Sequence, residues 1–138
     1  MKNILILCTG NSCRSQMAHG YLLHFTKNKM ANIYSAGIKA HGVNPNAIKS
    51  MKEDGIDIST HTSNKINEYK NVSFDFIITV CDNAKENCPI FPSSAIKIHF
   101  NFPDPAKATG TDDEISNQFN QVRLQIKNFC FDFVEKYL

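Results

Sequence analysis

The chain begins with a strand-like run that leads directly into a loop and then a helix. Residues 4–7 are Ile-Leu-Ile-Leu, the octapeptide from Cys8 to Ser15 follows, and an amphipathic segment starts at its end. A short continuous apolar run is typical of a buried strand, and apolar residues every three or four positions are typical of a helix. The octapeptide is therefore predicted to join the carboxyl end of a buried strand to the amino terminus of a helix, as in a parallel sheet.

This octapeptide, called the anion loop below, has the composition of an oxyanion site. Successive backbone N–H groups of a tight loop converge on one point, and the helix amino terminus adds partial positive charge there. Gly10 lets the loop curl without a side chain in the way. Arg14, one of only two arginines in the chain, supplies a planar fork for two oxygens of a tetrahedral anion. The predicted oxyanion-binding residues are Thr9, Gly10, Asn11, Ser12, Cys13 and Arg14.

Cys8 is predicted to be the nucleophile of this site. The field that holds an anion also favours the thiolate form of Cys8, and a Ser15 hydroxyl pointing at the sulfur would favour it further. The alternative is a buried strand-end cysteine followed by an ordinary turn, which the strand before the loop and the helix after it disfavour. A lipoprotein signal ending at Cys8 is also disfavoured, because a signal needs ~7–15 apolar residues and only four precede the cysteine.

Composition and charge narrow the classes of function. The 138 residues are expected to form one domain, residues 1–138, with a core of its own. No run approaches the ~18–20 apolar residues of a membrane span. A formal net charge of +2 without a basic stripe argues against a nucleic-acid partner. Five cysteines without a secretory signal predict a reducing cytoplasm, where thiols serve chemistry more often than structural bridges.

The remaining pattern alternates strands and helices, which predicts an α/β domain with a four-stranded parallel sheet covered on both faces and flanked by helices. Ligands of such sheets bind beyond the carboxyl ends of the strands, where Cys8 and Cys81 are both expected. The expected strands are residues 3–7, 33–36, 74–80 and 95–100; the expected helices are 15–29, 45–55, a short one capped by Thr62 or Ser63 and ending near Tyr69, and one from 115 to 138.

Cys81 and Cys88 form a second cysteine pair, separated by a polar segment. If the segment is helical, the alpha carbons of the pair lie ~10 Å apart, whereas a disulfide needs them within about 7 Å. The pair is therefore predicted to be a redox switch that closes only when the segment unwinds. The alternatives are two unrelated cysteines or a zinc site, but the spacings do not match a zinc knuckle, so no metal or cofactor is expected. Cys13 and Cys130 are expected to be packing residues.

Asp104 follows the last expected strand and lies between Pro103 and Pro105. The two prolines stiffen the backbone, so the carboxyl group could lean over the anion loop and pass a proton. A solvated turn aspartate is the alternative. The catalytic interpretation is favoured because it needs the same edge of the sheet as the anion loop.

Together, the anion loop, the Cys81–Cys88 pair and Asp104 resemble the low-molecular-weight tyrosine phosphatase superfamily, and more closely its thioredoxin-coupled arsenate reductase branch. The anion loop and Asp104-Pro105 are shared with the phosphatases, and the second cysteine pair resembles the reductases. The motifs Cys-Thr-Gly-Asn-Ser-Cys-Arg-Ser-Gln-Met-Ala, Tyr-Ser-Ala-Gly, His-Gly-Val-Asn-Pro and Asn-Cys-Pro accompany them. The resemblance covers the whole chain and implies a phosphatase-like sheet with the carboxyl-terminal helix packed on it.

The resemblance also implies a thiol relay. Cys8 would attack arsenate while Asp104 protonates the departing oxygen, Cys81 would then attack the Cys8 sulfur and release arsenite, and Cys88 would resolve the Cys8–Cys81 disulfide. Thioredoxin would reduce the resulting Cys81–Cys88 disulfide, and glutaredoxin with glutathione is the alternative reductant. Some relatives bind potassium beside the loop. Asn11 and Ser35 match two of the ligand positions, but His19 and Asn64 replace carboxylates, so a weak or absent potassium site and an ordinary, partly exposed His19 are expected.

Two other functions remain open at this point. A phosphatase acting on phosphotyrosine or a small phosphoester would use the same Cys8, Arg14 and Asp104, with the second cysteine pair protecting the nucleophile. A non-catalytic oxyanion or arsenic sensor would bind its ligand tightly without turnover.

Overall fold

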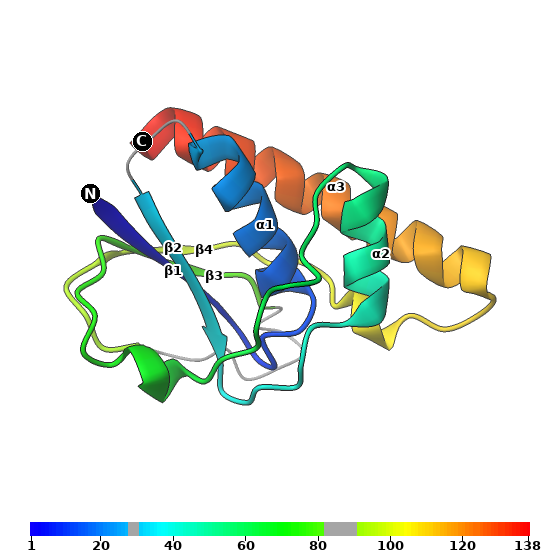
Figure 1. The fold of residues 1–138 in the computed structure, drawn as a ribbon, viewed down its shortest axis with the longest axis horizontal. Helices are drawn as coiled ribbons and strands as arrows, with labels where there is room; N and C mark the ends of the chain where they lie inside the picture. Colours follow the sequence, from blue (N-terminus) through cyan, green and yellow to red (C-terminus); the bar gives the residue numbers. More distant parts are fainter. Residues whose placement is uncertain (28–30, 82–90) are drawn as a thin grey trace.

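The chain folds around a parallel sheet whose central strand carries the anion loop (Figure 1). The computed structural model describes residues 1–27, 31–81 and 91–138. Its four strands are all parallel and lie in the order β2-β1-β3-β4. They are β1 (Lys2–Cys8), β2 (Ala31–Gly37), β3 (Phe76–Thr79) and β4 (Ile96–His99). The predicted four-stranded parallel sheet is confirmed, although β3 and β4 are shorter than expected.

The second and third α-helices begin where a side chain caps their amino termini. Asn44 accepts a hydrogen bond from the Asn46 amide at 2.8 Å, and Pro45 opens the following helix, as predicted. The last helix begins earlier than expected, because Thr111 and Glu114 form a capping box ahead of the first apolar residue. The helices are α1 (Arg14–Thr26), α2 (Pro45–Glu53) and α3 (Asp112–Tyr137), with 3-10 helices η1 (Ile66–Tyr69) and η2 (Pro105–Lys107).

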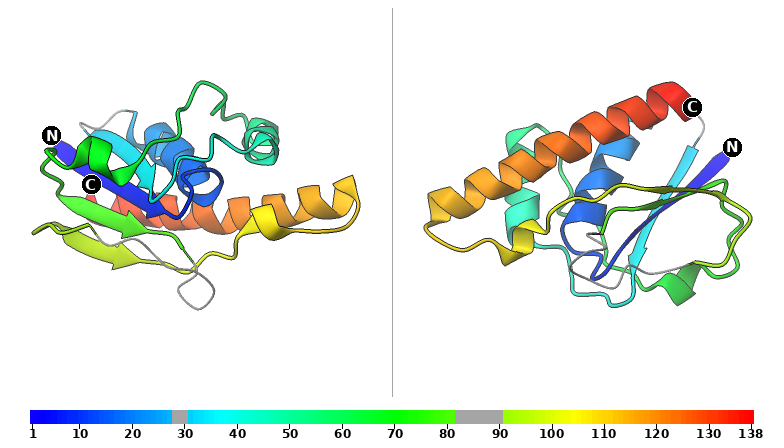
Figure 2. Two further views of the ribbon diagram at one scale, coloured as in Figure 1. Left: turned by 90° about the horizontal axis from the view of Figure 1, so that it is seen from below. Right: turned by 180° about the vertical axis from the view of Figure 1, so that it is seen from behind.

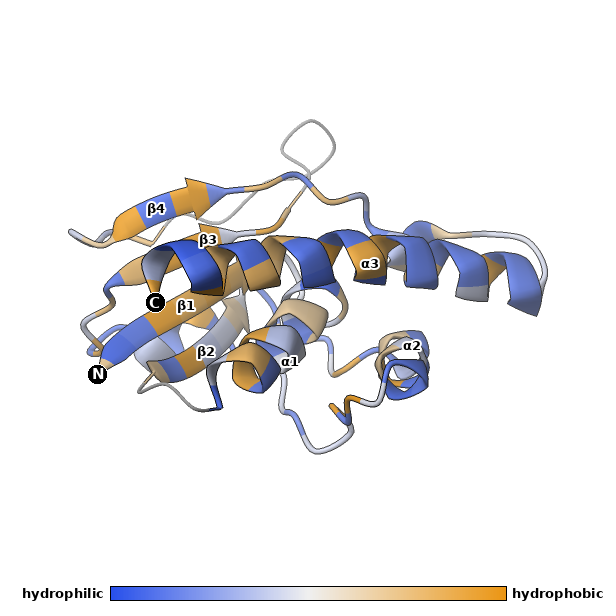
Figure 3. Ribbon diagram, turned by 90° about the horizontal axis from the view of Figure 1, so that it is seen from above, coloured by the Kyte–Doolittle hydropathy of each residue, from blue (hydrophilic) through white to orange (hydrophobic). Residues whose placement is uncertain are grey.

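The two faces of the sheet are covered differently. Ile4 and Ile6 of β1 pack into a large core with residues of α1 and α3, and Figure 3 shows α3 lying along the sheet with α1 beside it. Leu5 and Leu7 face the other way and pack with Phe74 and Phe91. A sheet covered on both faces was expected, and among the described residues the cover of this second face includes Ile66 and Tyr69 of η1 and the aromatic side chains of Phe74 and Phe91.

The carboxyl ends of the strands open toward one end of the molecule. The amino-terminal half of α3 extends past the arrowheads of the strands, as both views in Figure 2 show. Ser50 of α2 donates a hydrogen bond to Asn120 of α3 at 2.6 Å, which ties α2 to this projecting part. The sheet edge that carries the anion loop is therefore bordered by helices α1, α2 and α3. Among the described residues, no helix is long and apolar enough to cross a membrane.

Candidate active site

The anion loop lies between β1 and α1, as predicted. Cys8 is the last residue of β1, and Arg14 is the first residue of α1, with Cys13 at the helix cap. Because β1 lies between β2 and β3, the loop emerges from the middle of the sheet edge. Cys8 is 3% exposed and Arg14 is 2% exposed, so the site is recessed.

Backbone hydrogen bonds fix the orientation of the loop peptides. The carbonyl oxygens of Thr9, Gly10 and Ser12 accept bonds from the amides of Lys39, His41 and Asn44, at 3.1, 3.0 and 3.1 Å. The Asn11 carbonyl accepts from the side chains of Gln16 and Ser63, at 3.1 and 2.9 Å. In a trans peptide the N–H of the next residue points away from the carbonyl.

Four carbonyls held on the outside of the loop therefore direct the amides of Gly10, Asn11, Ser12 and Cys13 to its inside. Among the described residues, none of these four amides donates to a backbone carbonyl. The loop thus presents a concave set of donors beside the amino terminus of α1, which is an arrangement suited to an oxyanion.

Two glycines permit this close packing. A Cβ at Gly37, the last residue of β2, would lie 2.6 Å from the Thr9 carbonyl oxygen and 2.8 Å from the Asn11 amide nitrogen. A Cβ at Gly10 would lie 2.6 Å from Nδ1 of His41, so the imidazole packs directly on the loop. Gly10 was predicted to matter for loop curvature; its contact with His41 is a second reason for glycine.

Arg14 and Asp104 meet at the site, as predicted from the shared sheet edge. One guanidinium nitrogen of Arg14 donates to the Phe102 carbonyl at 3.2 Å, and the other lies 3.7 Å from Oδ2 of Asp104. The remaining Asp104 oxygen caps η2 by accepting from the Ala106 amide at 3.0 Å. Asp104 is therefore held at the mouth of the site with one oxygen beside the guanidinium.

A cavity of about 450 Å³ opens between these elements. Cys8 and Arg14 lie in its wall, and its outer part includes His41 and Lys107, which add positive or polar groups beyond the loop itself. Sequence reasoning assigned no role to these two residues, although His41 belongs to the quoted His-Gly-Val-Asn-Pro motif. The lining residues are Cys8, Thr9, Gly10, Ser12, Cys13, Arg14, His41, Asn44, Asp104, Ala106 and Lys107.

Ser15 and Asn11 form a buried pair behind the loop. Nδ2 of Asn11 donates to Oγ of Ser15 at 2.8 Å, and both residues are fully buried. Because the Ser15 oxygen accepts this bond, its hydrogen is directed elsewhere. The predicted hydrogen bond from Ser15 to the Cys8 sulfur stays a prediction.

Cys81 lies just beyond the end of β3, the strand next to the one that carries Cys8. It is fully buried, and its Sγ is 4.0 Å from the carbonyl oxygen of Leu7, the residue before Cys8. No disulfide joins any two of the four described cysteines, Cys8, Cys13, Cys81 and Cys130. Cys88 lies outside the described residues, so its pairing with Cys81 stays a prediction.

The other two described cysteines are suited to packing. Burial raises the pKa of the Cys13 thiol to about 12, and the nearby Asp104 and Cys8 add to the shift. Burial likewise raises the pKa of Cys130, which lies on the α3 face that contacts α1. Both thiols therefore stay protonated at neutral pH, in agreement with the structural role expected for them.

The four residues considered above for a potassium site form two hydrogen-bonded pairs. Nδ1 of His19 lies 2.7 Å from Oγ of Ser35, and Oδ1 of Asn11 accepts from the Asn64 amide at 2.8 Å. His19 was expected to be an ordinary, partly exposed helix residue, and it lies in α1 with intermediate exposure; its ring also packs against that of His61, with centroids 4.8 Å apart. Burial, and to a lesser degree His61, lowers the pKa of His19 to about 4. The described residues contain no group of three side chains arranged to hold a metal ion.

A parallel sheet that delivers a cysteine into an inward-facing ring of amides, with an arginine at the helix start, defines a cysteine-nucleophile enzyme of the phosphatase type. Sequence comparison agrees: the chain belongs to the low molecular weight phosphotyrosine protein phosphatase family, whose profile matches residues 3–137.

Relatives within this family carry a more specific name. The chain is 48% identical to an arsenate reductase of Halalkalibacterium halodurans over 97% of its own length and 96% of the relative's. It is 46% identical to an arsenate reductase of Bacillus subtilis over the same shares of the two chains. Among solved structures, an arsenate reductase in the phosphate binding state superimposes with a TM-score of 0.83 at 32% identity, covering all of both chains.

Proposed function

We propose that this chain is an arsenate reductase that converts arsenate to arsenite through its own thiols. The observation that carries the proposal is that Cys8, the inward-facing amides, Arg14 and Asp104 share one cavity, while Cys81 lies on the adjacent strand end. Relatives at nearly half identity over almost the whole chain, named arsenate reductases, support the same activity.

The first step forms a bond between Cys8 and arsenic. The thiolate attacks arsenate while the loop amides and Arg14 hold its oxygens, and one oxygen leaves as water after Asp104 gives it a proton. Arsenic stays pentavalent in this thioarsenate adduct. Arg14 is suited to the step because its fork contacts the anion through two parallel N–H groups.

The second step transfers two electrons to arsenic. Cys81 attacks the Cys8 sulfur, a Cys8–Cys81 disulfide forms, the sulfur–arsenic bond breaks, and arsenite leaves with the electron pair. Cys88 then attacks Cys81, which releases the Cys8 thiolate and leaves a Cys81–Cys88 disulfide. The attack of Cys81 on the Cys8 sulfur needs the two cysteines close together. The contact of Cys81 with the carbonyl of Leu7, the residue before Cys8, supports that requirement.

The cycle closes when an external dithiol reduces the Cys81–Cys88 disulfide. We assign this role to thioredoxin in the cytoplasm, because a dithiol reductant regenerates both sulfurs in one exchange sequence. Glutaredoxin with glutathione is the competing reductant.

The deciding experiment measures NADPH oxidation that depends on arsenate. Purified enzyme is supplied with thioredoxin and thioredoxin reductase in one arm, and with glutaredoxin, glutathione and glutathione reductase in the other. Arsenate-dependent turnover in the thioredoxin arm is expected. Turnover in the glutaredoxin arm alone would reassign the reductant, and no turnover in either arm would overturn the proposal.

A weak phosphatase activity is the second candidate, because the family profile and the Cys8–Arg14–Asp104 geometry are both shared with phosphotyrosine phosphatases. Phosphate esters can enter the same ring of amides, but phosphate does not accept two electrons. Hydrolysis of an aryl phosphate as fast as arsenate reduction would favour phosphatase activity as a main function of the chain.

A further inference from the structure

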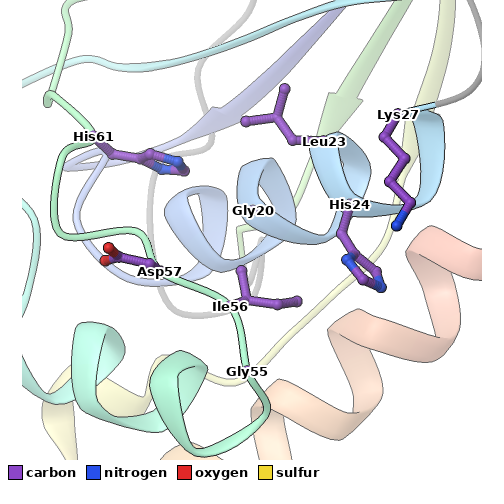
Figure 4. A pocket seen from close by; sticks show the side chains of 8 residues that line it. All are labelled: Gly20, Leu23, His24, Lys27, Gly55, Ile56, Asp57 and His61. Atoms are coloured by element: carbon purple, nitrogen blue, oxygen red, sulfur yellow. The ribbon is translucent and has the colours of Figure 1, made fainter.

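Behind the anion loop, the segment from His61 to Asn64 runs along the first turn of α1. Figure 4 shows the His61 side chain extending from this segment toward α1, at the border of a small pocket. The segment contacts the loop at several points: the Ser63 hydroxyl donates to the Asn11 carbonyl at 2.9 Å, and the Asn64 amide donates to Oδ1 of Asn11 at 2.8 Å.

Gln16 joins this segment to the loop from within α1. Its side chain is fully buried, and Nε2 donates to the Asn11 carbonyl at 3.1 Å and to the Thr62 carbonyl at 2.9 Å. Both hydrogens of the amide are therefore used, and each goes to an acceptor that cannot donate.

The two carbonyls fix which way this amide points, because a flipped amide would place its oxygen against both of them. With this orientation Oε1 of Gln16 lies 3.2 Å from Nδ1 of His61. An amide oxygen can only accept, so the hydrogen bond requires the His61 tautomer with its hydrogen on Nδ1.

The peptide that Gln16 holds is a strained point of the loop. Asn11 has a φ of 47°, in the left-handed region, and is fully buried. Such a conformation is strained for a residue with a side chain and persists when its surroundings hold it. The Asn11 carbonyl belongs to the same rigid peptide as the Ser12 amide, so holding the carbonyl outward aims the Ser12 N–H inward.

We propose that Gln16 is a positioning residue of the active site, whose carboxamide aims the Ser12 amide at the bound oxyanion by holding the Asn11 carbonyl. The proposal rests on the proposed function only in that the anion loop binds an oxyanion. Gln16 itself does not line the cavity. It acts through the loop backbone, and through the Thr62 carbonyl it also couples the loop to the segment behind it.

The test is a graded series of substitutions that vary the number of donors at nearly constant volume. Gln16→Glu, kept neutral by burial, retains one donor, and Gln16→Met retains none. Thr26→Val is the matched control, because Thr26 is also buried on α1 and its hydroxyl donates to the Leu22 carbonyl at the far end of the helix.

Inorganic phosphate binding is measured by calorimetry, and thermal unfolding is measured in parallel. The Kd for phosphate should rise in the order wild type, Gln16→Glu, Gln16→Met, by about tenfold or more for Gln16→Met. The reason is that the Ser12 N–H is no longer held in the direction of the bound oxyanion. The kcat for arsenate should also fall, and by more than the fraction of protein that is unfolded at the assay temperature accounts for. Thr26→Val should lose stability and keep the wild-type Kd.

The outcomes separate this inference from the proposed function. Wild-type protein that bound neither phosphate nor arsenate would refute the oxyanion site itself. Wild-type binding with an unchanged Kd in both Gln16 variants would refute the positioning role alone. If Gln16→Met does not fold, Gln16→Glu decides: an unchanged Kd and kcat in that variant would also refute the role.

Discussion

The sulfur of Cys81 lies 4.0 Å from the carbonyl oxygen of Leu7, one residue before the nucleophile Cys8. The parallel register explains the contact, because Leu7 pairs with Thr79 and the Val80 amide donates to the Leu7 carbonyl. Cys81, just beyond the end of β3, is therefore next to the peptide that joins Leu7 to Cys8 at the end of β1.

Replacing Cys8 with serine should abolish arsenate reduction and any phosphatase activity together, because both begin with the same thiolate. The measurement is arsenate-dependent NADPH oxidation beside hydrolysis of a chromogenic aryl phosphate. Cys130→Ala, which removes a buried thiol far along α3, should keep both activities. Residual arsenate turnover in Cys8→Ser would mean that another group is the nucleophile.

Arg14→Lys should lower kcat/KM for arsenate by well over tenfold, where tenfold corresponds to about 1.4 kcal/mol of barrier. A lysine places a single point charge where the guanidinium offers a planar fork, and it loses the contact with the Phe102 carbonyl. Arg123→Lys is the control, since the other arginine contacts Ser50 and Glu53 away from the cavity. A loss of less than tenfold would show that Arg14 is not the main oxyanion contact.

Asp104→Asn should slow formation of the covalent adduct by ~10²–10⁴-fold, the usual value of general acid catalysis. Asparagine keeps an oxygen that can cap η2 at the Ala106 amide, so the local fold should persist. Rapid-quench kinetics of the first turnover measure the step, and phosphate inhibition measures anion binding. An equal loss of affinity and rate would make Asp104 a structural residue of the loop.

Cys88→Ser should leave a single turnover intact and block the next one. Cys8 and Cys81 suffice to release one arsenite per enzyme, after which the protein should stall as a Cys8–Cys81 disulfide that thioredoxin does not process efficiently. Arsenite quantification and peptide mapping under non-reducing conditions provide the measurement. A bridge between Cys8 and Cys13, or no bridge at all, would contradict the relay.

Acid should destabilise the fold through His19. Its pKa falls from 6.5 to about 4 on folding, so between these values the unfolded chain binds more protons, and the free energy of unfolding decreases as pH falls. Burial also lowers the pKa of the neighbouring His61, which contributes in the same direction. His19→Gln, which can still bond Ser35, should flatten this part of the pH profile in denaturant titrations; an unchanged slope would contradict it.

The positions of most site residues could be predicted because they are close in sequence. The strand, the anion loop and the start of α1 occupy consecutive positions, and the placement of Cys81 and Asp104 follows from the rule that parallel strands end at one edge. The roles of Gln16, Ser63 and His41 could not be predicted, because their hydrogen bonds join segments far apart in sequence. Their chemistry is generic, and only the fold selects their partners.

Helix coverage was the least predictable part of the fold. Phe74 and Phe91 are apolar like strand residues, yet both lie outside the strands and pack with Tyr69 on the second face of the sheet. The periodicity of apolar residues in a sequence indicates which residues are buried. It does not indicate which helix, strand or loop they pack against.

Lys39, His41 and Asn44 hold the loop carbonyls from one side, and Gln16 and Ser63 hold them from the other, so the amides are aimed when the chain folds and before any anion arrives. The positive ends of the inward N–H dipoles repel one another, and the negative charge of a bound oxyanion would offset that repulsion. Phosphate is then a ligand of the native state alone. At a concentration of about 100 times its Kd, phosphate bound in this way would add about 2.7 kcal/mol to the free energy of unfolding.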